Sequence, residues 1–316
     1  MTDILTITLN PALDVATSCE QLQPSHKLRC SHAERFPGGG GINVARVVQR
    51  LGGDCLALYL AGGGVGDRLQ ELLQAERVPS HRLFIANETR ESFSVLETRT
   101  GREYRFVLPG PALTQAEWQG CVDFLAAVEP APRYVVLSGS LPPALPIDSY
   151  AQLARLAQSR GCKVVLDSSG APTAAALAAG VFLIKPSLRE LADITGAQLD
   201  NETQWRAAAQ SLLHDGRTEL VALSLGERGA MLFSADGAWR ADALQVNVKS
   251  TTGAGDSFLA AMVWALNQDM ALPRAFRYGV AAGSAALVHA GTTLCRADDV
   301  ARLVHQVQVH AIAGPL

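Results

Sequence analysis

The sequence predicts an α/β fold in which helices cover both faces of a mostly parallel β-sheet. Short runs that are apolar on both faces recur along the chain and alternate with amphipathic helical stripes. That order is typical of a doubly covered sheet. The chain has 316 residues, 48% of them hydrophobic, which is enough for one large core. We therefore expect residues 1–316 to form one domain, with any small appendage built on it.

The elements follow from the local patterns in chain order. Val44, Val47, Val48 and Leu51 form a helical stripe with i, i+3, i+4 and i+7 spacing. "ALSLGERGAMLF" (222–233) predicts a strand, a glycine turn and a return strand, as in an ordinary hairpin. The last forty or so residues are expected to be helical. The buried parallel strands are expected at residues 4–9, 55–62, 133–141, 163–169, 181–187 and 219–226.

Two segments depart from this alternation. Residues 12–35 and 87–108 contain polar-faced strand patterns without an intervening helix. They predict a small separate sheet. Because ligands of α/β sheets bind at the carboxyl ends of the strands, we expect this sheet to lie over a site there.

Charge and cysteine content exclude several classes of protein. The formal net charge is −3, so the chain has no basic surface of the kind that nucleic acids require. The six cysteines contain no C-x-x-C pair and predict reduced thiols rather than a zinc site or a disulfide framework. "MTDILTITLN" lacks a basic leader, and no apolar run approaches the ~18 residues of a membrane span. We expect a cytoplasmic protein without a nucleic-acid or membrane partner.

Four consecutive glycines, Gly38 to Gly41, directly precede the predicted helix in "FPGGGGINVARVVQRLGG". Glycines there let backbone N–H groups approach an anion closely at a helix N-terminus. The alternative is a flexible turn. The run is not a Walker loop, which requires G-x-x-x-x-G-K-[ST], and it lacks the G-x-G-x-x-G of a dinucleotide site.

A second glycine-rich turn, "TTGAGDS" (251–257), adds an acid. Gly253, Ala254 and Gly255 are placed to aim successive N–H groups at one anion, with Asp256 in the first turn of the next helix. A carboxylate beside a bound phosphate is repelled unless it has a role, and the natural role is to accept a proton from the attacking hydroxyl. The alternative is a simple helix cap.

Other polar residues are weaker candidates. Lys185 and Glu190 follow an apolar strand, where they can neutralise phosphate and reach a magnesium ion, directly or through water. Arg90 and Arg105 lie on polar strand faces and suit a sugar phosphate. The alternative for all four residues is an ordinary solvated surface, where Lys, Glu and Arg are common.

Together these residues resemble the PfkB (ribokinase-like) family of carbohydrate kinases over essentially the whole chain. The specific matches are "PGGGGINVARVVQRLGG" and "TTGAGDSFLAA", in the family's order and spacing. "TLNPALD", "KLRC", "YRFVLPG", "LSGSLPP", "LSLG" and "GVAAGSAA" make the pattern most similar to the family's bacterial 6-phosphofructokinase branch. The resemblance implies a ribokinase-like fold with a β lid formed from about 12–35 and 87–108, and a homodimer in which two lids clasp.

The same resemblance implies ATP- and magnesium-dependent transfer of the γ-phosphoryl group to a sugar-phosphate hydroxyl, with Asp256 as the base. It assigns the Gly253, Ala254 and Gly255 amides to the transferring phosphoryl group. It also implies a monovalent cation such as potassium. Its further assignments are Asp14, Lys27, Gly38, Gly39, Asn43, Arg90, Arg105 and Ser138 to the substrate; Lys185, Ser187, Ser224, Gly226, Gly229 and Ser284 to the nucleotide; Glu190 to magnesium; and Ser250, Thr252, Ala286, Gly291 and Thr293 to the monovalent cation.

The chain departs from family patterns at two positions. Relatives that phosphorylate fructose 1-phosphate or tagatose 6-phosphate usually carry a lysine where this chain has Gly40, which favours fructose 6-phosphate as the substrate. Ser187 replaces the asparagine of the family's "KPN". The alternatives are a tagatose-6-phosphate kinase, a 1-phosphofructokinase, a catalytically silent sugar-phosphate sensor and a nucleotide-cofactor oxidoreductase. The absence of the Rossmann fingerprint disfavours the oxidoreductase.

Overall fold

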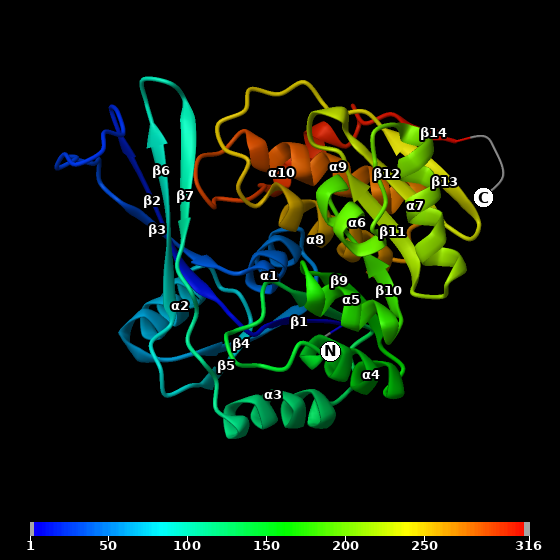
Figure 1. Cartoon of the computed structure of the whole chain (residues 1–316), viewed down its shortest axis with the longest axis horizontal. Coiled ribbons are helices and arrows are strands. Elements are labelled where there is room, and N and C mark those ends of the chain that lie inside the picture. The colour runs from blue at the N-terminus through cyan, green and yellow to red at the C-terminus, as the bar shows by residue number, and fades with distance from the viewer. Residues whose placement is uncertain (1–2, 313–316) are drawn as a thin grey trace.

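Ten strands form the larger sheet of the computed structural model, which describes residues 3–312 (Figure 1). Seven of them, in the order β11-β10-β9-β8-β1-β4-β5, run parallel to their neighbours, and β12, β13 and β14 continue the sheet antiparallel. The strands are β1 (Ile4–Thr8), β4 (Cys55–Ala61), β5 (Ser80–Phe84), β8 (Tyr134–Ser138), β9 (Lys163–Asp167), β10 (Val181–Ile184), β11 (Thr218–Ser224), β12 (Ala230–Ser234), β13 (Gly237–Ala241) and β14 (Val309–Ala311).

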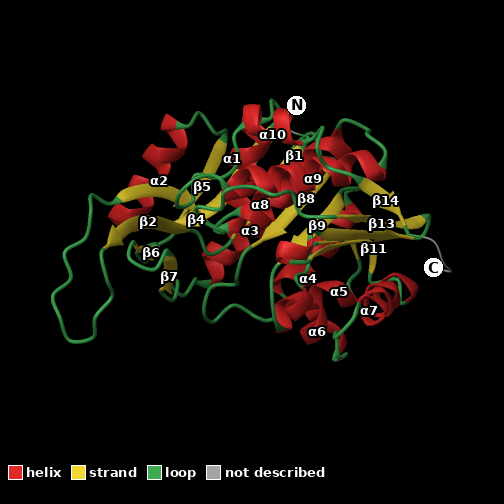
Figure 2. Ribbon diagram, turned by 90° about the horizontal axis from the view of Figure 1, so that it is seen from above, coloured by secondary structure: helices red, strands yellow, loops and turns green. Residues whose placement is uncertain are grey.

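Helices cover both faces of this sheet, as the alternating sequence pattern predicts (Figure 2). One face carries α1 (Gly40–Arg50), α2 (Gly63–Ala75), α8 (Ala254–Asn267), α9 (Leu272–Leu287) and α10 (Ala297–Leu303). The other carries α3 (Gln115–Ala127), α4 (Ser149–Ser159), α5 (Ala171–Ala178), α6 (Leu188–Thr195) and α7 (Glu202–His214). The predicted doubly covered α/β fold is therefore confirmed.

A separate four-stranded sheet stands at one end of the molecule, at the left of Figure 1. Its order is β3 (Glu34–Gly38), β2 (Ala12–Cys19), β6 (Arg90–Glu97) and β7 (Arg102–Val107), and only β2 and β6 are parallel. The predicted small sheet is confirmed. Residues 20–33, however, form a long connection that projects beyond the sheet and contains no strand (Figure 2).

The chain end differs from expectation. Helices α9 and α10 are present, but residues 288–296 are not helical and β14 is a strand. The sequence pattern misses this strand because it is three residues long and is held by pairing with β13 at the sheet edge. Within residues 3–312, every helix is too short or too polar to cross a bilayer.

The strand order reverses beside β1. From β1 the chain builds outward through β4 and β5, and after β8 it builds outward on the other side through β9, β10 and β11. In such sheets the crevice at the carboxyl ends of the strands beside the reversal binds ligands. Ser138 ends β8 and Asp167 ends β9, and the two residues are register partners at this edge.

Candidate active site

A cavity of about 410 Å³ opens at this carboxyl edge of the large sheet. The small sheet, the glycine turn before α1, the ends of β8 and β9, and the N-terminus of α8 all contribute to its walls. The cavity therefore brings together segments from both halves of the chain. The predicted site residues that line it are Asp14, Gly39, Asn43, Arg90, Arg105, Ser138, Glu190, Thr252, Gly253, Gly255 and Asp256.

One face of the small sheet covers the cavity. Alternate residues of its strands line the wall, namely Asp14 of β2, Arg90 and Ser92 of β6, and Arg105 and Val107 of β7. Successive side chains of a strand point to opposite faces, so this alternation shows that the sheet presents a single face inward. That face carries two guanidinium groups.

Asp256 is held by Asn43 and does not cap its helix. Gly253, with φ of 76°, is the N-cap of α8, and Asp256 lies in the first turn. The Asp256 carboxylate instead accepts a hydrogen bond of 2.8 Å at Oδ2 from Asn43 Nδ2. The capping interpretation is excluded. The acid faces the cavity beside the N-terminal amides of α8, whose partial positive charge favours an anion.

Asp167, in the cavity wall, forms an ion pair with the buried Lys185 behind it. Lys185 Nζ lies 3.2 Å from Asp167 Oδ1. Burial raises the pKa of Asp167 to about 6, against the opposing effect of Lys185. Burial also opposes the charge of Lys185, but the carboxylates of Asp167 and Asp256 raise its pKa above the ordinary value. The lysine therefore stays cationic next to Gly255, whose missing side chain leaves the ammonium room at the start of α8.

Burial raises the pKa of Asp256 above its ordinary value, against the hydrogen bond from Asn43. With the reference pKa of an aspartate, about 3.9, Asp256 would be a base by its position alone. The structure adds a second factor, because a carboxylate with a raised pKa is a stronger base.

The four glycines leave space for polar groups of the site. A Cβ at Gly38 would lie 2.5 Å from the Asp14 carboxylate, and one at Gly40 would lie 2.1 Å from Ser138 Oγ. Gly39 has φ of 113° and is the N-cap of α1. The glycines are therefore required because side chains of the site approach the backbone closely here, and the run is not merely a flexible turn.

Several polar groups facing the cavity are unengaged. Ser138 Oγ and Thr252 Oγ1 are buried and have no hydrogen-bond partner within residues 3–312. Buried polar atoms are normally paired, so unpaired ones in a cavity wall indicate a ligand. The guanidinium group of Arg105 likewise forms no hydrogen bond or ion pair in the described part of the chain.

Arg90 and Asp14 have partners in the cavity wall. The Arg90 guanidinium donates a hydrogen bond of 3.0 Å to the Asn10 carbonyl and one of 3.1 Å to the Leu108 carbonyl. Asp14 Oδ2 accepts 3.0 Å from Thr292 Oγ1. Arg90 therefore ties β6 to the segments that flank the cavity.

Other predicted residues lie outside the cavity wall. Lys27 is exposed in the 20–33 connection. Ser187 caps α6 and shares a capping box with Glu190, whose Oε2 accepts from Ser187 Oγ at 2.9 Å. The Cβ of a substituted Gly229 would lie 2.1 Å from the Ala241 carbonyl, so β13 packing requires this glycine. Gly38, Ala254, Lys185, Ser187, Ser224, Gly226, Gly229 and Ser284 are absent from the lining, and their roles stay predictions.

The residues predicted for a monovalent cation lie on two loops, except Ala286, which lies in the last turn of α9. Lys249 N and Ser250 N both donate to the carbonyl of Leu287, so the first loop is joined to the end of α9. Ser250 Oγ donates 2.9 Å to Glu103 Oε2 of β7, and the Thr293 carbonyl accepts 2.5 Å from Arg50. Thr252 is the member of the set with an unengaged side-chain oxygen.

Sequence reasoning missed Asp167. The acid ends the apolar run "KVVLD", exactly where the carboxyl edge of a parallel strand lies, and that position was the available signal. Ser140, Ser168 and Ser169, which also line the cavity, follow strand ends in the same way.

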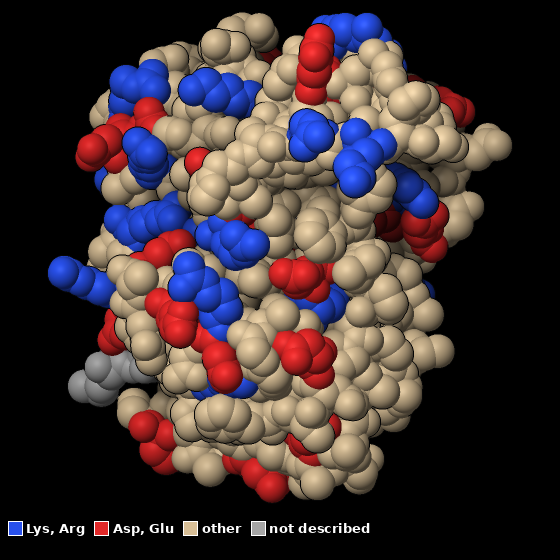
Figure 3. All heavy atoms as spheres, turned by 90° about the vertical axis from the view of Figure 1, so that its left-hand side faces the viewer, with Lys and Arg blue, Asp and Glu red and all other residues tan. Residues whose placement is uncertain are grey.

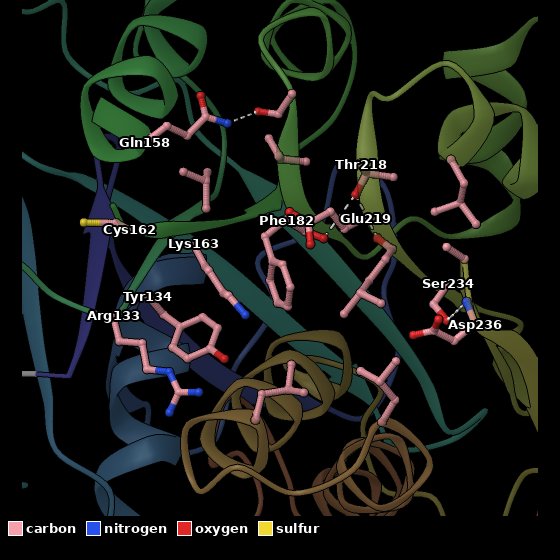
Figure 4. Close-up of a pocket in the computed structure, with 18 of the residues that line it drawn as sticks. Arg133, Tyr134, Gln158, Cys162, Lys163, Phe182, Thr218, Glu219, Ser234 and Asp236 are labelled. Atoms are coloured by element: carbon pink, nitrogen blue, oxygen red, sulfur yellow. Dashed lines mark hydrogen bonds between the residues drawn. The ribbon is translucent and has the colours of Figure 1, made fainter. Parts of the chain in front are cut away.

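A larger cavity of about 760 Å³ lies at the opposite, amino edge of the sheet (Figure 4). It is lined by the starts of β8, β9 and β10 and by the α8–α9 connection, with Lys163 Nζ 4.5 Å from the centre of the Phe182 ring. Ligands of parallel sheets bind at the carboxyl edge, so the smaller cavity is the candidate active site.

The chain is similar to known carbohydrate kinases over most of its length. The model of the pfkB family carbohydrate kinases matches residues 4–299. The ATP-dependent 6-phosphofructokinase isozyme 2 of Mycobacterium tuberculosis is 44% identical over 95% of this chain and 88% of its own length. A 1-phosphofructokinase of Xanthomonas campestris is 37% identical over 84% of each chain.

The fold has a solved counterpart. The crystal structure of phosphofructokinase-2 from Escherichia coli in complex with fructose-6-phosphate superposes with a TM-score of 0.92 at 38% identity, covering 97% of this chain and 99% of that one. Structures of the same Escherichia coli protein describe a complex with potassium and a tetrameric inhibited form.

Proposed function

The chain belongs to the pfkB family of carbohydrate kinases, and we propose that it transfers the γ-phosphoryl group of ATP to the C1 hydroxyl of fructose 6-phosphate, giving fructose 1,6-bisphosphate and ADP. The observation that carries this proposal is the Asp256 carboxylate, which faces one cavity together with the N-terminus of α8 and the guanidinium of Arg105. A base, an anion hole and a phosphate-binding cation are the parts that this reaction needs.

Asp256 acts as the general base. As the sugar O1 forms its bond to the γ-phosphorus and the bond to the bridging oxygen of ADP breaks, the hydroxyl proton passes to Asp256. Asn43 holds the carboxylate in place, and the α8 amides from Gly253 to Gly255 stabilise the charge on the transferring group. Lys185, buried at the same helix end, adds a fixed positive charge.

The inner face of the small sheet binds the phosphate already on the sugar. Arg105 is the uncommitted cation of that face, and planar guanidinium groups bind phosphate through two parallel hydrogen bonds. Ser138 Oγ is buried, unpaired and directed at the same cavity, as a partner for a sugar hydroxyl. The small sheet therefore serves as a lid over the substrate.

The acidic groups present fit a magnesium ion. Asp167 and Glu190 line the cavity near the anion hole, and proteins usually hold Mg²⁺ through one or two carboxylates together with substrate phosphates. When bound, magnesium neutralises phosphate charge and orients the phosphates. The unpaired Thr252 hydroxyl fits a monovalent cation, which would add positive charge beside α8.

Gly40 is the position that favours fructose 6-phosphate over fructose 1-phosphate. It lines the cavity against Ser138, where any larger side chain occupies substrate space. The similarity to a 1-phosphofructokinase keeps that activity as the second candidate. Tagatose 6-phosphate differs from the preferred substrate at one carbon centre only and is the third.

The test is a panel of fructose 6-phosphate, tagatose 6-phosphate, fructose 1-phosphate and unphosphorylated fructose, each with ATP and magnesium and with ADP release as the readout. The proposal requires the highest kcat/KM for fructose 6-phosphate. Preference for fructose 1-phosphate would support the second candidate. Binding of fructose 6-phosphate without ADP release would make the protein a sensor.

We further propose that two copies form a homodimer through the small sheets. Strand β7 is an edge strand, and the side chains of Tyr104, Phe106 and Leu108 are exposed there. Figure 3 shows this end of the molecule, where charges of both signs are interspersed with uncharged surface. Sedimentation of the wild type and of Phe106→Glu tests the proposal. A dimer that the substitution dissociates supports it, and an unchanged dimer places the interface elsewhere.

A further inference from the structure

Arg46 is a buried cation behind the candidate active site. Its exposed fraction is 1%, and it does not line the cavity. Nε lies 2.9 Å and Nη2 2.6 Å from the Glu76 carboxylate, at the end of α2. These bonds engage Nε and Nη2. The remaining nitrogen, Nη1, donates to three acceptors on the side of the candidate active site.

The first acceptor of Arg46 Nη1 is the side chain that holds the base. Nη1 donates 3.2 Å to Asn43 Oδ1. A carboxamide has one acceptor end and one donor end, so a donor at Oδ1 fixes which end faces Asp256. Asn43 must then direct Nδ2 at the Asp256 carboxylate, to which it donates at 2.8 Å.

The second acceptor of Arg46 Nη1 leads to Asp14, another of the acids that line the cavity. Nη1 donates 3.2 Å to the Thr292 carbonyl, and Thr292 Oγ1 donates 3.0 Å to Asp14 Oδ2. The third acceptor, the Pro37 carbonyl at 2.9 Å, belongs to β3 and precedes Gly38, the glycine that leaves room for the Asp14 carboxylate. One guanidinium thus stands one residue away from both Asp256 and Asp14.

We propose that Arg46 is a positioning residue for phosphoryl transfer, which sets the orientation of Asn43 and Thr292 and through them of the base Asp256 and the substrate-side acid Asp14. The inference rests on the proposed function. A buried ion pair is costly to form, and the bond to Glu76 provides the charge balance that lets the guanidinium stay buried. Lysine cannot replace Arg46, because its single ammonium group cannot bond Glu76 and the acceptors of Nη1 at the same time, as the planar guanidinium does.

Arg50 supplies a matched control. It lies one turn further along α1, bonds the same Glu76 carboxylate at 3.0 Å and donates to the carbonyls of Thr293 and Cys295. Within residues 3–312 it forms no hydrogen bond with Asn43 or Thr292. Arg46→Lys and Arg50→Lys therefore both disturb the ion pairs with Glu76, but only Arg46 is linked to Asp256 and Asp14 through a single intervening residue.

The experiment measures kcat and KM for the best sugar phosphate, with circular dichroism as the check on folding. Arg46→Lys should lower kcat about tenfold or more, since small misplacement of reacting groups is costly. Arg50→Lys should stay within about threefold of wild type, as partly exposed ion pairs contribute little. In an Asn43→Ala background the effect of Arg46→Lys on kcat should be smaller, because the hydrogen bond between Arg46 and Asn43 is already lost.

Equal effects of the two lysine variants, or full additivity with Asn43→Ala, would overturn the inference. If Arg46→Lys does not fold, Asn43→Ala tests the link to Asp256 and Thr292→Val tests the link to Asp14. Unchanged kcat in both variants would overturn the inference. An inactive wild type would refute the proposed function instead. The acid limb of the pH profile gives an independent readout, because the Asn43 hydrogen bond lowers the pKa of Asp256. Lys185, Asp14 and Arg105 also face Asp256 and stay in place in both lysine variants. The limb should therefore move to higher pH in Arg46→Lys and stay in place in Arg50→Lys.

Discussion

Asn43 Nδ2 donates a 2.8 Å hydrogen bond to Asp256 Oδ2, joining the first turn of α1 to the first turn of α8 across more than two hundred residues of sequence. Both helices begin at glycine N-caps that direct free amides toward the cavity. The bond therefore couples the two glycine-rich motifs, and it sets both the position and the basicity of the proposed base.

Asn43→Ala should move the acid limb of kcat/KM to higher pH. The protonated form of Asp256 cannot accept a proton, so the rate is full above the raised pKa and falls as the pH drops through it. The Asn43 hydrogen bond lowers the pKa of Asp256 against the effect of burial, and removing it raises that pKa further. The measurement is kcat/KM between pH 5 and 9. A limb that stays in place or moves to lower pH would show that another group controls it.

Arg105→Ala and Arg90→Ala should separate substrate binding from folding. Arg105 is uncommitted, so its loss should raise KM for fructose 6-phosphate by about tenfold or more while the melting temperature stays unchanged. Arg90 bonds the carbonyls of Asn10 and Leu108, so its loss should also lower the melting temperature. Thermal unfolding beside steady-state kinetics checks both. An unchanged KM in Arg105→Ala would remove this residue from the phosphate site.

Ser187→Asn should lower the magnesium concentration needed for half-maximal rate by several-fold, because asparagine reaches further than serine toward the metal's water shell. Asparagine caps helices as well as serine does, so the melting temperature should not change. Ser187→Ala is the control that loses the cap, at a cost of about 1 kcal/mol in the free energy of unfolding. A magnesium requirement that Asn leaves unchanged would assign this position to the helix alone.

The sequence predicts those elements whose burial is complete. The runs that became β1, β4, β8, β9, β10 and β11 are apolar on both faces and need no tertiary information. Edge strands such as β14 lack that signal, because their pairing partner and not their composition holds them.

The candidate site shows the same limit. Asp256 lies in a motif whose spacing favours a catalytic acid. The resemblance assigns Asn43 to the substrate, and its hydrogen bond to Asp256 is seen only in the folded chain. Arg46, by contrast, looks in the sequence like an ordinary surface arginine of a helix. Only the packing of α1 against residue 292 and α2 shows that it is buried. Asp167 has a signal in the sequence, its place at the end of an apolar run, but its pairing with Lys185 is seen only in the folded chain.

The central claim is that Asp256 is the base, and the Asp256→Asn variant tests it most directly. Asparagine keeps the shape of the side chain and removes the proton acceptor. With fructose 6-phosphate and magnesium ATP, kcat should fall by about 10² or more, the range for general-base catalysis, while the melting temperature stays close to that of the wild type. Asp269→Asn, an exposed acid just beyond the end of the same helix, is the control and should keep full activity. Wild-type kcat in Asp256→Asn would contradict the account.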